Sequence, residues 1–140
     1  MKKRIVCVLL ALTMVFSVGA VTVFAAIAPP DVEPQNTAVV GFITRRYSDT
    51  KAAASADIDF TKTAPNYTII IILQRKKDGE WITAVDVDGN THRYYGKNSS
   101  SVLTYDEWTV KKGDLYRIKC ISTDRHDGIQ YTRTCYSDPF

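Results

Sequence analysis

The chain has 140 residues and a formal net charge of +3 at neutral pH, from 18 basic and 15 acidic residues. The whole excess lies in Lys2, Lys3 and Arg4. Without the first 25 residues the charges balance, which argues against a nucleic-acid-binding protein, because such a protein needs a basic surface to displace counterions. The remaining part, about 115 residues, is the size of one domain with a substantial core.

Residues 1–25 are predicted to be a secretory signal peptide. The three basic residues precede an uncharged apolar stretch at 5–20, and Val23 and Ala25 stand three and one positions before the expected cut. An uncleaved membrane anchor is the alternative, but the apolar stretch is short for a membrane span. We therefore expect a secreted, extracellular protein that is not attached to the membrane after cleavage.

Residues 26–36 contain three prolines and no hydrophobic periodicity, so they are predicted to form an extended leader. The domain itself is expected at residues 37–140, with its first strands at 37–47 and 52–60. The segment 52–60 alternates, and one set of positions fits a core-facing strand: Ala52, Ala54, Ala56, Ile58 and Phe60. An alanine-rich helix is the alternative for this segment, because alanine is the best helix former.

A central hairpin is predicted from residue 67 to residue 87. Its first strand is the isoleucine-rich run 67–75, since β-branched side chains favour strands, and its second strand is 80–87. A two-residue turn at Asp78-Gly79 would pair Lys76 with Trp81, whereas a three-residue turn would pair Arg75 with Trp81. We predict the three-residue turn, because it places the apolar residues of both strands on one face that can join the core. That face would consist of Ile69, Ile71, Leu73, Trp81 and Val85.

The same register places Ile70, Ile72, Ile82 and Ala84 together on the opposite face of the hairpin. Monomeric proteins rarely leave a large contiguous apolar patch exposed. We therefore expect this face to be covered by the leader, by residues 88–101, by a partner or by a second copy. Its isoleucines are a possible interaction surface.

The most polar part of the chain, residues 88–101, holds His92, Tyr94 and Tyr95 on a predicted short edge strand. These three residues are a second possible interaction surface, although two adjacent tyrosines usually place one ring inside the fold and one outside. The acidic residues around Gly89 lack the spacing of an EF-hand, so we predict no metal site. No serine lies in a G-x-S-x-G context. We expect no catalytic residue, no cofactor and no enzymatic activity.

The last strands are predicted at 101–110, 114–122 and 129–136, with Val102 and Trp108 as anchors of the first. Cys120 and Cys135 are equidistant from Asp127-Gly128, so a hairpin at that point would place them opposite each other. A disulfide is the expectation for two cysteines in an exported chain, with a redox or metal role as the alternative. A four-residue loop, 126–129, would put them at a non-hydrogen-bonded pair.

Residues 110–119, V-K-K-G-D-L-Y-R-I-K, resemble the corner before strand F of fibronectin type III and related immunoglobulin-like sandwiches. Together with L-Q-R-K-K-D-G-E-W at 73–81 and W-x-V-x-x-G-x-x-Y-R at 108–117, they are similar to small secreted Gram-positive bacterial proteins of unknown function. The resemblance implies an all-β, single antiparallel β-sandwich of about seven strands. It also implies that Tyr116 bonds to upstream backbone. Immunoglobulin domains bridge their two sheets with a disulfide, whereas these cysteines would join neighbouring strands.

These observations predict a secreted, non-catalytic binding module whose partner is a protein or glycan at a cell surface. The alternative is a structural or interbacterial-competition protein that acts by self-association. A cationic membrane-active peptide is disfavoured by the charge balance of the mature chain, because such peptides need a basic amphipathic face. The sequence leaves the oligomeric state open.

Overall fold

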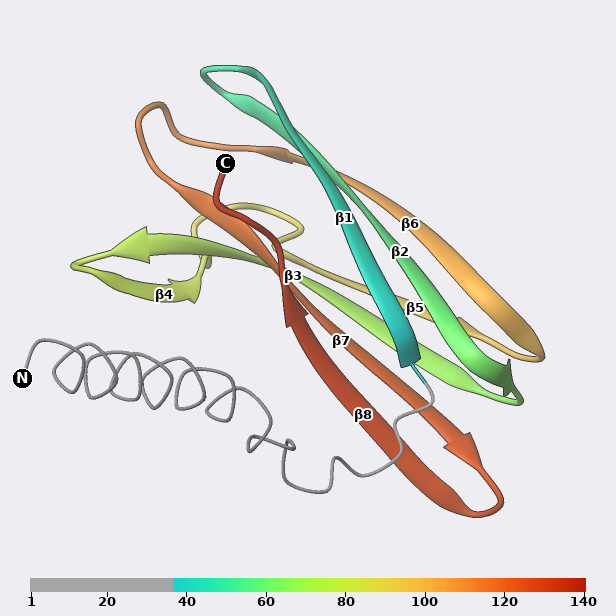
Figure 1. Ribbon diagram of the computed structural model, residues 1–140. Helices are drawn as coiled ribbons and strands as arrows, with labels where there is room; N and C mark the ends of the chain where they lie inside the picture. Colours follow the sequence, from blue (N-terminus) through green and yellow to red (C-terminus); the bar gives the residue numbers. More distant parts are fainter. Residues whose placement is uncertain (1–36) are drawn as a thin grey trace, which may run out of the picture. The chain divides into compact units, whose positions relative to one another are not determined.

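The computed structural model describes residues 37–140, so the predicted signal peptide and leader lie outside the described residues. The described chain forms an all-β antiparallel sandwich in two sheets, as the sequence predicted, with eight strands instead of the expected seven or so (Figure 1). Sheet A has the order β1 (Thr37–Ser48), β2 (Lys51–Ala64), β6 (Ser99–Thr109). Sheet B consists of β3 (Tyr67–Lys77), β4 (Glu80–Thr83), β5 (Thr91–Gly96), β7 (Tyr116–His126) and β8 (Ile129–Tyr136). Within residues 37–140 there is no helix with the length and apolar character needed to cross a membrane.

Strand β3 organises sheet B. It pairs with β7 on one side, and on the other side with β5 along residues 67–72 and with β4 along residues 74–77. Strand β8 pairs with β7 and lies at the outer edge of the sheet. The β3–β4 hairpin projects away from sheet A (Figure 1).

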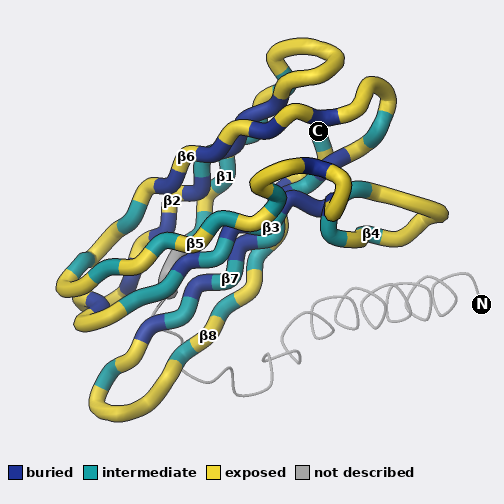
Figure 2. Tube along the Cα trace, turned by 180° about the vertical axis from the view of Figure 1, so that it is seen from behind, coloured by how far each residue is buried: buried dark blue, intermediate teal, exposed yellow. Residues whose placement is uncertain are grey.

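The core lies between the inner faces of the two sheets. Along β2 all five predicted core residues are buried, namely Ala52, Ala54, Ala56, Ile58 and Phe60 (Figure 2). Ala53 on the other face is buried too, and from Ala54 to Phe60 buried residues alternate with more exposed ones. A segment whose burial alternates with period two is a strand, so the helical alternative is excluded. The small alanines leave room for larger side chains from the opposite sheet, which are Ile69, Ile71, Leu73, Tyr116 and Ile118.

The register of the β3–β4 hairpin differs from the prediction. Lys76 pairs with Trp81 across a two-residue turn, Asp78-Gly79, whose φ values are 51° and 86°. Positive φ at both central residues is the type I′ geometry, which matches the right-handed twist of the flanking strands. The predicted three-residue turn is therefore wrong.

Trp81 and Val85 do not belong to the core face. The observed register places Trp81 on the outer face of sheet B with Ile70 and Ile72, and Val85 is 79% exposed. Strand β4 ends at Thr83 rather than near residue 87, because the Leu73 N–H donates to the Asn90 carbonyl and not to Ala84, and the chain turns with a bond from the Val87 N–H to the Ala84 carbonyl.

The predicted corner before β7 is present. Tyr116 is fully buried, and its hydroxyl oxygen accepts a hydrogen bond from the Lys111 N–H at 3.0 Å. This bond fixes the turn at residues 110–115 against the core. Trp108 is also buried, at 3% exposure, as predicted for an anchor of β6.

Candidate functional site

The outer face of sheet A carries the largest exposed side chains of β1 and β6. The register aligns Ile43 of β1, Ser55 of β2 and Tyr105 of β6 in one row across the sheet. Because the outward residues of β2 near this row are small, the larger side chains of β1 and β6 stand on either side of them. Four large residues of this face are well exposed: Ile43 (75%), Leu103 (71%), Tyr105 (55%) and Tyr47 (52%).

Polar groups surround the two tyrosines of this face. The Arg45 guanidinium lies 5.0 Å from the centre of the Tyr47 ring, and the Tyr105 hydroxyl donates a hydrogen bond to Glu107. The bond to Glu107 and a further one with Tyr47 raise the pKa of Tyr105 above its ordinary value. The face thus combines exposed rings with a carboxylate and a guanidinium, which suits a ligand that has both apolar and hydrogen-bonding groups.

A pocket of about 510 Å³ opens at the Tyr47 end of this face. Its lining consists of Tyr47, Lys51, Ala52, Glu107, Trp108 and Thr109. A volume of this size lies within the range of about 300–1,000 Å³ that small-molecule sites occupy. The adjacent β1–β2 turn is tied to the β6–β7 turn by an ion pair of 2.8 Å between Asp49 and Lys112.

The predicted group His92, Tyr94 and Tyr95 is divided between two environments. Asp106 is 4% exposed, and its Oδ1 atom contacts two side chains of β5. One contact is with His92 Nδ1, and the other is a hydrogen bond of 2.7 Å from the Tyr94 hydroxyl. Burial, and then the hydrogen bond to Asp106, raise the pKa of Tyr94 to about 12. Tyr95 instead is 70% exposed. One ring of the tyrosine pair therefore faces inward and the other outward, as predicted.

The inward residues of this group join the two sheets. His92 and Tyr94 belong to β5 of sheet B, whereas Asp106 belongs to β6 of sheet A. The His92 ring stacks on Trp108 with 6.0 Å between ring centres, and a Cβ atom at Gly89 would lie only 3.0 Å from His92 Nε2. This packing identifies His92 as a link between the sheets.

The predicted isoleucine face is only partly formed. Ile70 and Ile72 are half-buried on the outer face of sheet B, but Ile82 pairs with Arg75 and so lies on the other face. Residues 88–101 do not cover Ile70 and Ile72, because they form β5 at the edge and the start of β6. The expectation that residues 88–101 cover the isoleucine face is therefore wrong. The expectation that the leader covers it concerns residues outside the described part.

Trp81 packs with charged and aromatic neighbours on the outer face of sheet B. The Arg117 guanidinium lies 4.6 Å from the centre of the Trp81 ring and 4.2 Å from that of Tyr136. Arg117 also donates a hydrogen bond of 2.8 Å to Gln74. In the register, Ile70 and Ile72 lie beside Ile121 and Lys119 of β7, and both are half-buried.

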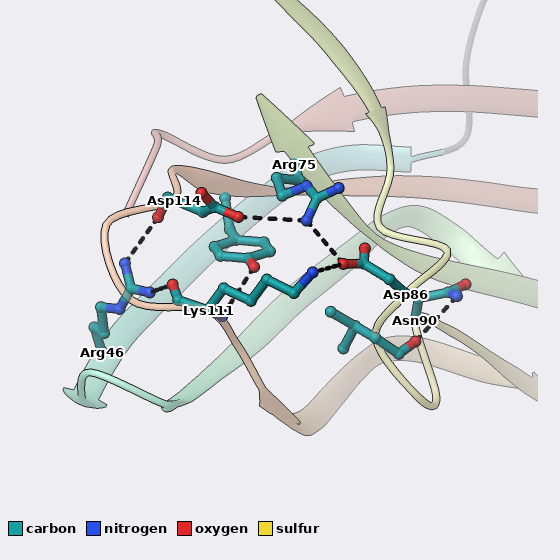
Figure 3. A network of polar contacts seen from close by, with 8 residues as sticks. Arg46, Arg75, Asp86, Asn90, Lys111 and Asp114 are labelled. Atoms are coloured by element: carbon teal, nitrogen blue, oxygen red, sulfur yellow. Dashed lines mark hydrogen bonds and ion pairs between the residues drawn. The ribbon is translucent and has the colours of Figure 1, made fainter. Parts of the chain in front are cut away.

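A network of charged residues closes the end of the sandwich near the β6–β7 turn (Figure 3). Arg75 pairs with Asp86 at 2.8 Å and with Asp114 at 3.3 Å, and Lys111 pairs with Asp86. Arg46 donates to the Asp114 carbonyl at 2.8 Å. The hydrogen bond from Lys111 holds the pKa of Asp86 below its usual value. Arg75 and Lys111 are thus paired with carboxylates, whereas the Arg46 guanidinium donates to the backbone carbonyls of Lys111 and Asp114. The network therefore ties β1, β3 and the loop after β4 to the β6–β7 turn.

Cys120 and Cys135 lie directly opposite each other in β7 and β8, as predicted, and both are free thiols in the structure. The hairpin has a two-residue turn, Asp127-Gly128, instead of the predicted four-residue loop. The Ser137 N–H donates to the Ile118 carbonyl, so Ile118 and Ser137 form a hydrogen-bonded pair. Such pairs recur every two residues along an antiparallel ladder, so Cys120 and Cys135 also occupy a hydrogen-bonded pair. The predicted non-hydrogen-bonded position is therefore wrong. Burial, and then the proximity of Cys135, raise the pKa of the Cys120 thiol to about 12.

No cluster of three or more potential metal ligands occurs among residues 37–140. The prediction did not include Tyr47, Leu103, Tyr105 or Glu107 in an interaction surface. The alternation along β6 was the available signal, because Leu103, Tyr105 and Glu107 are out of phase with the anchors Val102 and Trp108.

Comparisons with known proteins identify no family for this chain. No protein-family model matches the sequence, and no curated protein matches it. Among solved structures, the E. coli curli protein CsgC aligns with a TM-score of 0.40 and 10% identity over 68% of this chain and 94% of that chain. A calcium-binding mutant of Bacteroides uniformis β-glucuronidase 2 aligns with a TM-score of 0.39 and 16% identity over 70% of this chain and 13% of that chain. These likenesses carry no argument about function.

Proposed function

We propose that this chain is a secreted, non-catalytic binding module whose ligand, a protein or glycan at a cell surface, docks on the outer face of sheet A. The observation that carries this proposal is the exposure of Ile43, Tyr47, Leu103 and Tyr105 on one face of one sheet. Apolar groups in such a contiguous arrangement are typical of interaction sites, and tyrosine is enriched among the residues that dominate binding energy.

Export is supported by the order of basic residues, apolar stretch and small residues at the N-terminus. The proposed absence of catalysis is supported by the packing of His92 between Trp108 and Gly89, where its imidazole serves the fold. A relationship to fibronectin type III domains is supported by Tyr116 and by a sheet that joins the first, second and sixth strands. Sandwich folds of this kind host many functions, so the ligand has to be argued from the site.

The test uses the secreted protein and its variant with Tyr47→Ala and Tyr105→Ala, applied to cell-wall polysaccharide and to surface-protein fractions. We expect the wild-type protein to bind one fraction and the variant to bind it more weakly by about tenfold or more, because two ring contacts are lost. Tyr95→Ala is the matched control, since Tyr95 is 70% exposed but belongs to sheet B. Equal losses in the control and the double variant would contradict the proposed face.

The alternative function, a structural or competition protein that acts by self-association, is favoured by a different observation, the open edge of β1.

We also propose that Cys120 and Cys135 form a disulfide once the protein has been exported, because they occupy directly opposite positions. Mass spectrometry of freshly secreted protein without reductant is expected to show a mass two hydrogens below that of the reduced chain. In the reduced protein, alkylation should modify Cys135 before Cys120, since Cys120 is buried and its thiol pKa is raised to about 12. Recovery of two alkylatable thiols from fresh secreted material would contradict the bridge.

A further inference from the structure

Strand β1 lies at an edge of sheet A, and its second side is not paired with any strand of the described residues. It runs over 12 residues, Thr37–Ser48, and pairs with β2 on its other side. An unpaired edge presents a row of backbone N–H and C=O groups that can extend the sheet onto another chain. Proteins ordinarily blunt such edges with charges, prolines, bulges or short strands.

The other edges of the sandwich carry such protection. On β6, the opposite edge of sheet A, the Tyr94 hydroxyl donates to the Tyr105 carbonyl at 3.2 Å, and Asp106 and Glu107 add charge. In sheet B, β4 has four residues, β5 has six and includes charged Arg93, and β8 has eight and includes Arg133. On β1 such features lie only toward the ends, with register irregularities between Thr37 and Val39 and between Arg46 and Ser48. Residues 39–44 between them pair regularly with β2 and read V-V-G-F-I-T, with neither a charge nor a proline.

We propose that β1 pairs antiparallel with β1 of a second copy of this chain, in a register centred on Phe42. A twofold axis at Phe42 places Ile43 opposite Gly41 of the second copy, so outward residues face outward residues across the new pair. Arg45 then lies opposite Val39 of the second copy, which separates the arginines of the two chains. Val40 and Phe42, which are partly buried and packed against the core, would lose their remaining exposure at the joined edge.

Gly41 supports this register. A Cβ atom at Gly41 would meet nothing within 4 Å, and its backbone does not lie in the left-handed region, so packing within this chain does not require glycine there. Glycine inside a strand weakens it and often marks the close approach of another chain or ligand. Ile43 is 75% exposed in the single chain. In the proposed pair, the Ile43 side chain of each copy would cover the space above Gly41 of the other.

Sedimentation of the secreted protein from micromolar to millimolar concentration tests the proposal. We expect a monomer–dimer equilibrium in the wild type. Gly41→Lys is expected to keep the melting temperature, because its side chain enters open space, and to raise the dimer dissociation constant by about tenfold or more, because it brings two ammonium groups near the twofold axis. Gly41→Val is the matched control, and it should still form the dimer.

Hydrogen exchange at the same concentrations provides a second readout. Amides of residues 40–44 whose N–H groups point away from β2 should become protected as the dimer forms, and Gly41→Lys should abolish that protection. A wild type that stays monomeric at every concentration would overturn the proposal, and so would a dimer that Gly41→Lys leaves unchanged. Protection of these amides only after addition of an extended peptide would assign the edge to a different partner and would also refute pairing between copies.

Discussion

Replacing Trp108 with alanine is expected to lower the free energy of unfolding by about 3–5 kcal/mol. The Trp108 side chain is 3% exposed, stacks on His92 and donates from Nε1 to the Gly89 carbonyl at 2.8 Å. Its removal leaves a cavity between the sheets and an unpaired carbonyl, and it frees the His92 ring. Urea denaturation followed by far-ultraviolet circular dichroism measures the loss without depending on tryptophan fluorescence.

The second tryptophan is the natural control. Trp81 lies on the outer face of sheet B against Arg117, so Trp81→Ala should cost only about 1 kcal/mol, the scale of an exposed cation–π contact. Similar losses for the two variants would indicate that Trp81 belongs to the core, and hence that the hairpin has the three-residue turn. The comparison therefore tests the register as well as the packing.

Replacing Ile71 with lysine is expected to prevent folding. Ile71 is 1% exposed between Cys120 of β7 and His92 of β5 in the register of sheet B. A lysine there would exchange a buried apolar side chain for an uncompensated buried charge, at a cost comparable with the total stability of about 5–15 kcal/mol of a small domain. The expected result is a variant without a cooperative unfolding transition in circular dichroism.

Ile72, the residue after Ile71, provides the matched control substitution. Ile72 points to the outer face and is half-buried, so Ile72→Lys should fold with a loss of about 1 kcal/mol. If Ile72→Lys also failed to fold, Ile72 would have to lie in a covered core on the outer side of sheet B. A folded Ile72→Lys protein that lost a partner bound by the wild type would instead mark this face as an interface.

The sequence by itself indicated most of the strands and, for β2, β3 and β7, which of their residues face inward. Alternation with period two is a local property, so the inward positions of β2 and β7 and the inward residues of β3 follow from the order of residues alone. The opposite placement of Cys120 and Cys135 also follows locally, because both are equidistant from one turn. The bond made by Tyr116 was implied by its position after the K-K-G-D corner.

Only the tertiary structure decided the register of the β3–β4 hairpin and the identity of the exposed face. Asp78-Gly79 alone favours the two-residue type I′ turn, whereas the apolar pattern of 69–85 favours the three-residue turn. The folded hairpin has the type I′ turn and bonds the Ala84 N–H to the Leu73 carbonyl, so the apolar pattern was misleading here. Likewise, Tyr47 and Tyr105 are 58 positions apart in sequence and meet because β2 lies between β1 and β6. Strand neighbours are set by long-range packing, so a candidate surface made by three strands arises only when the sheet assembles.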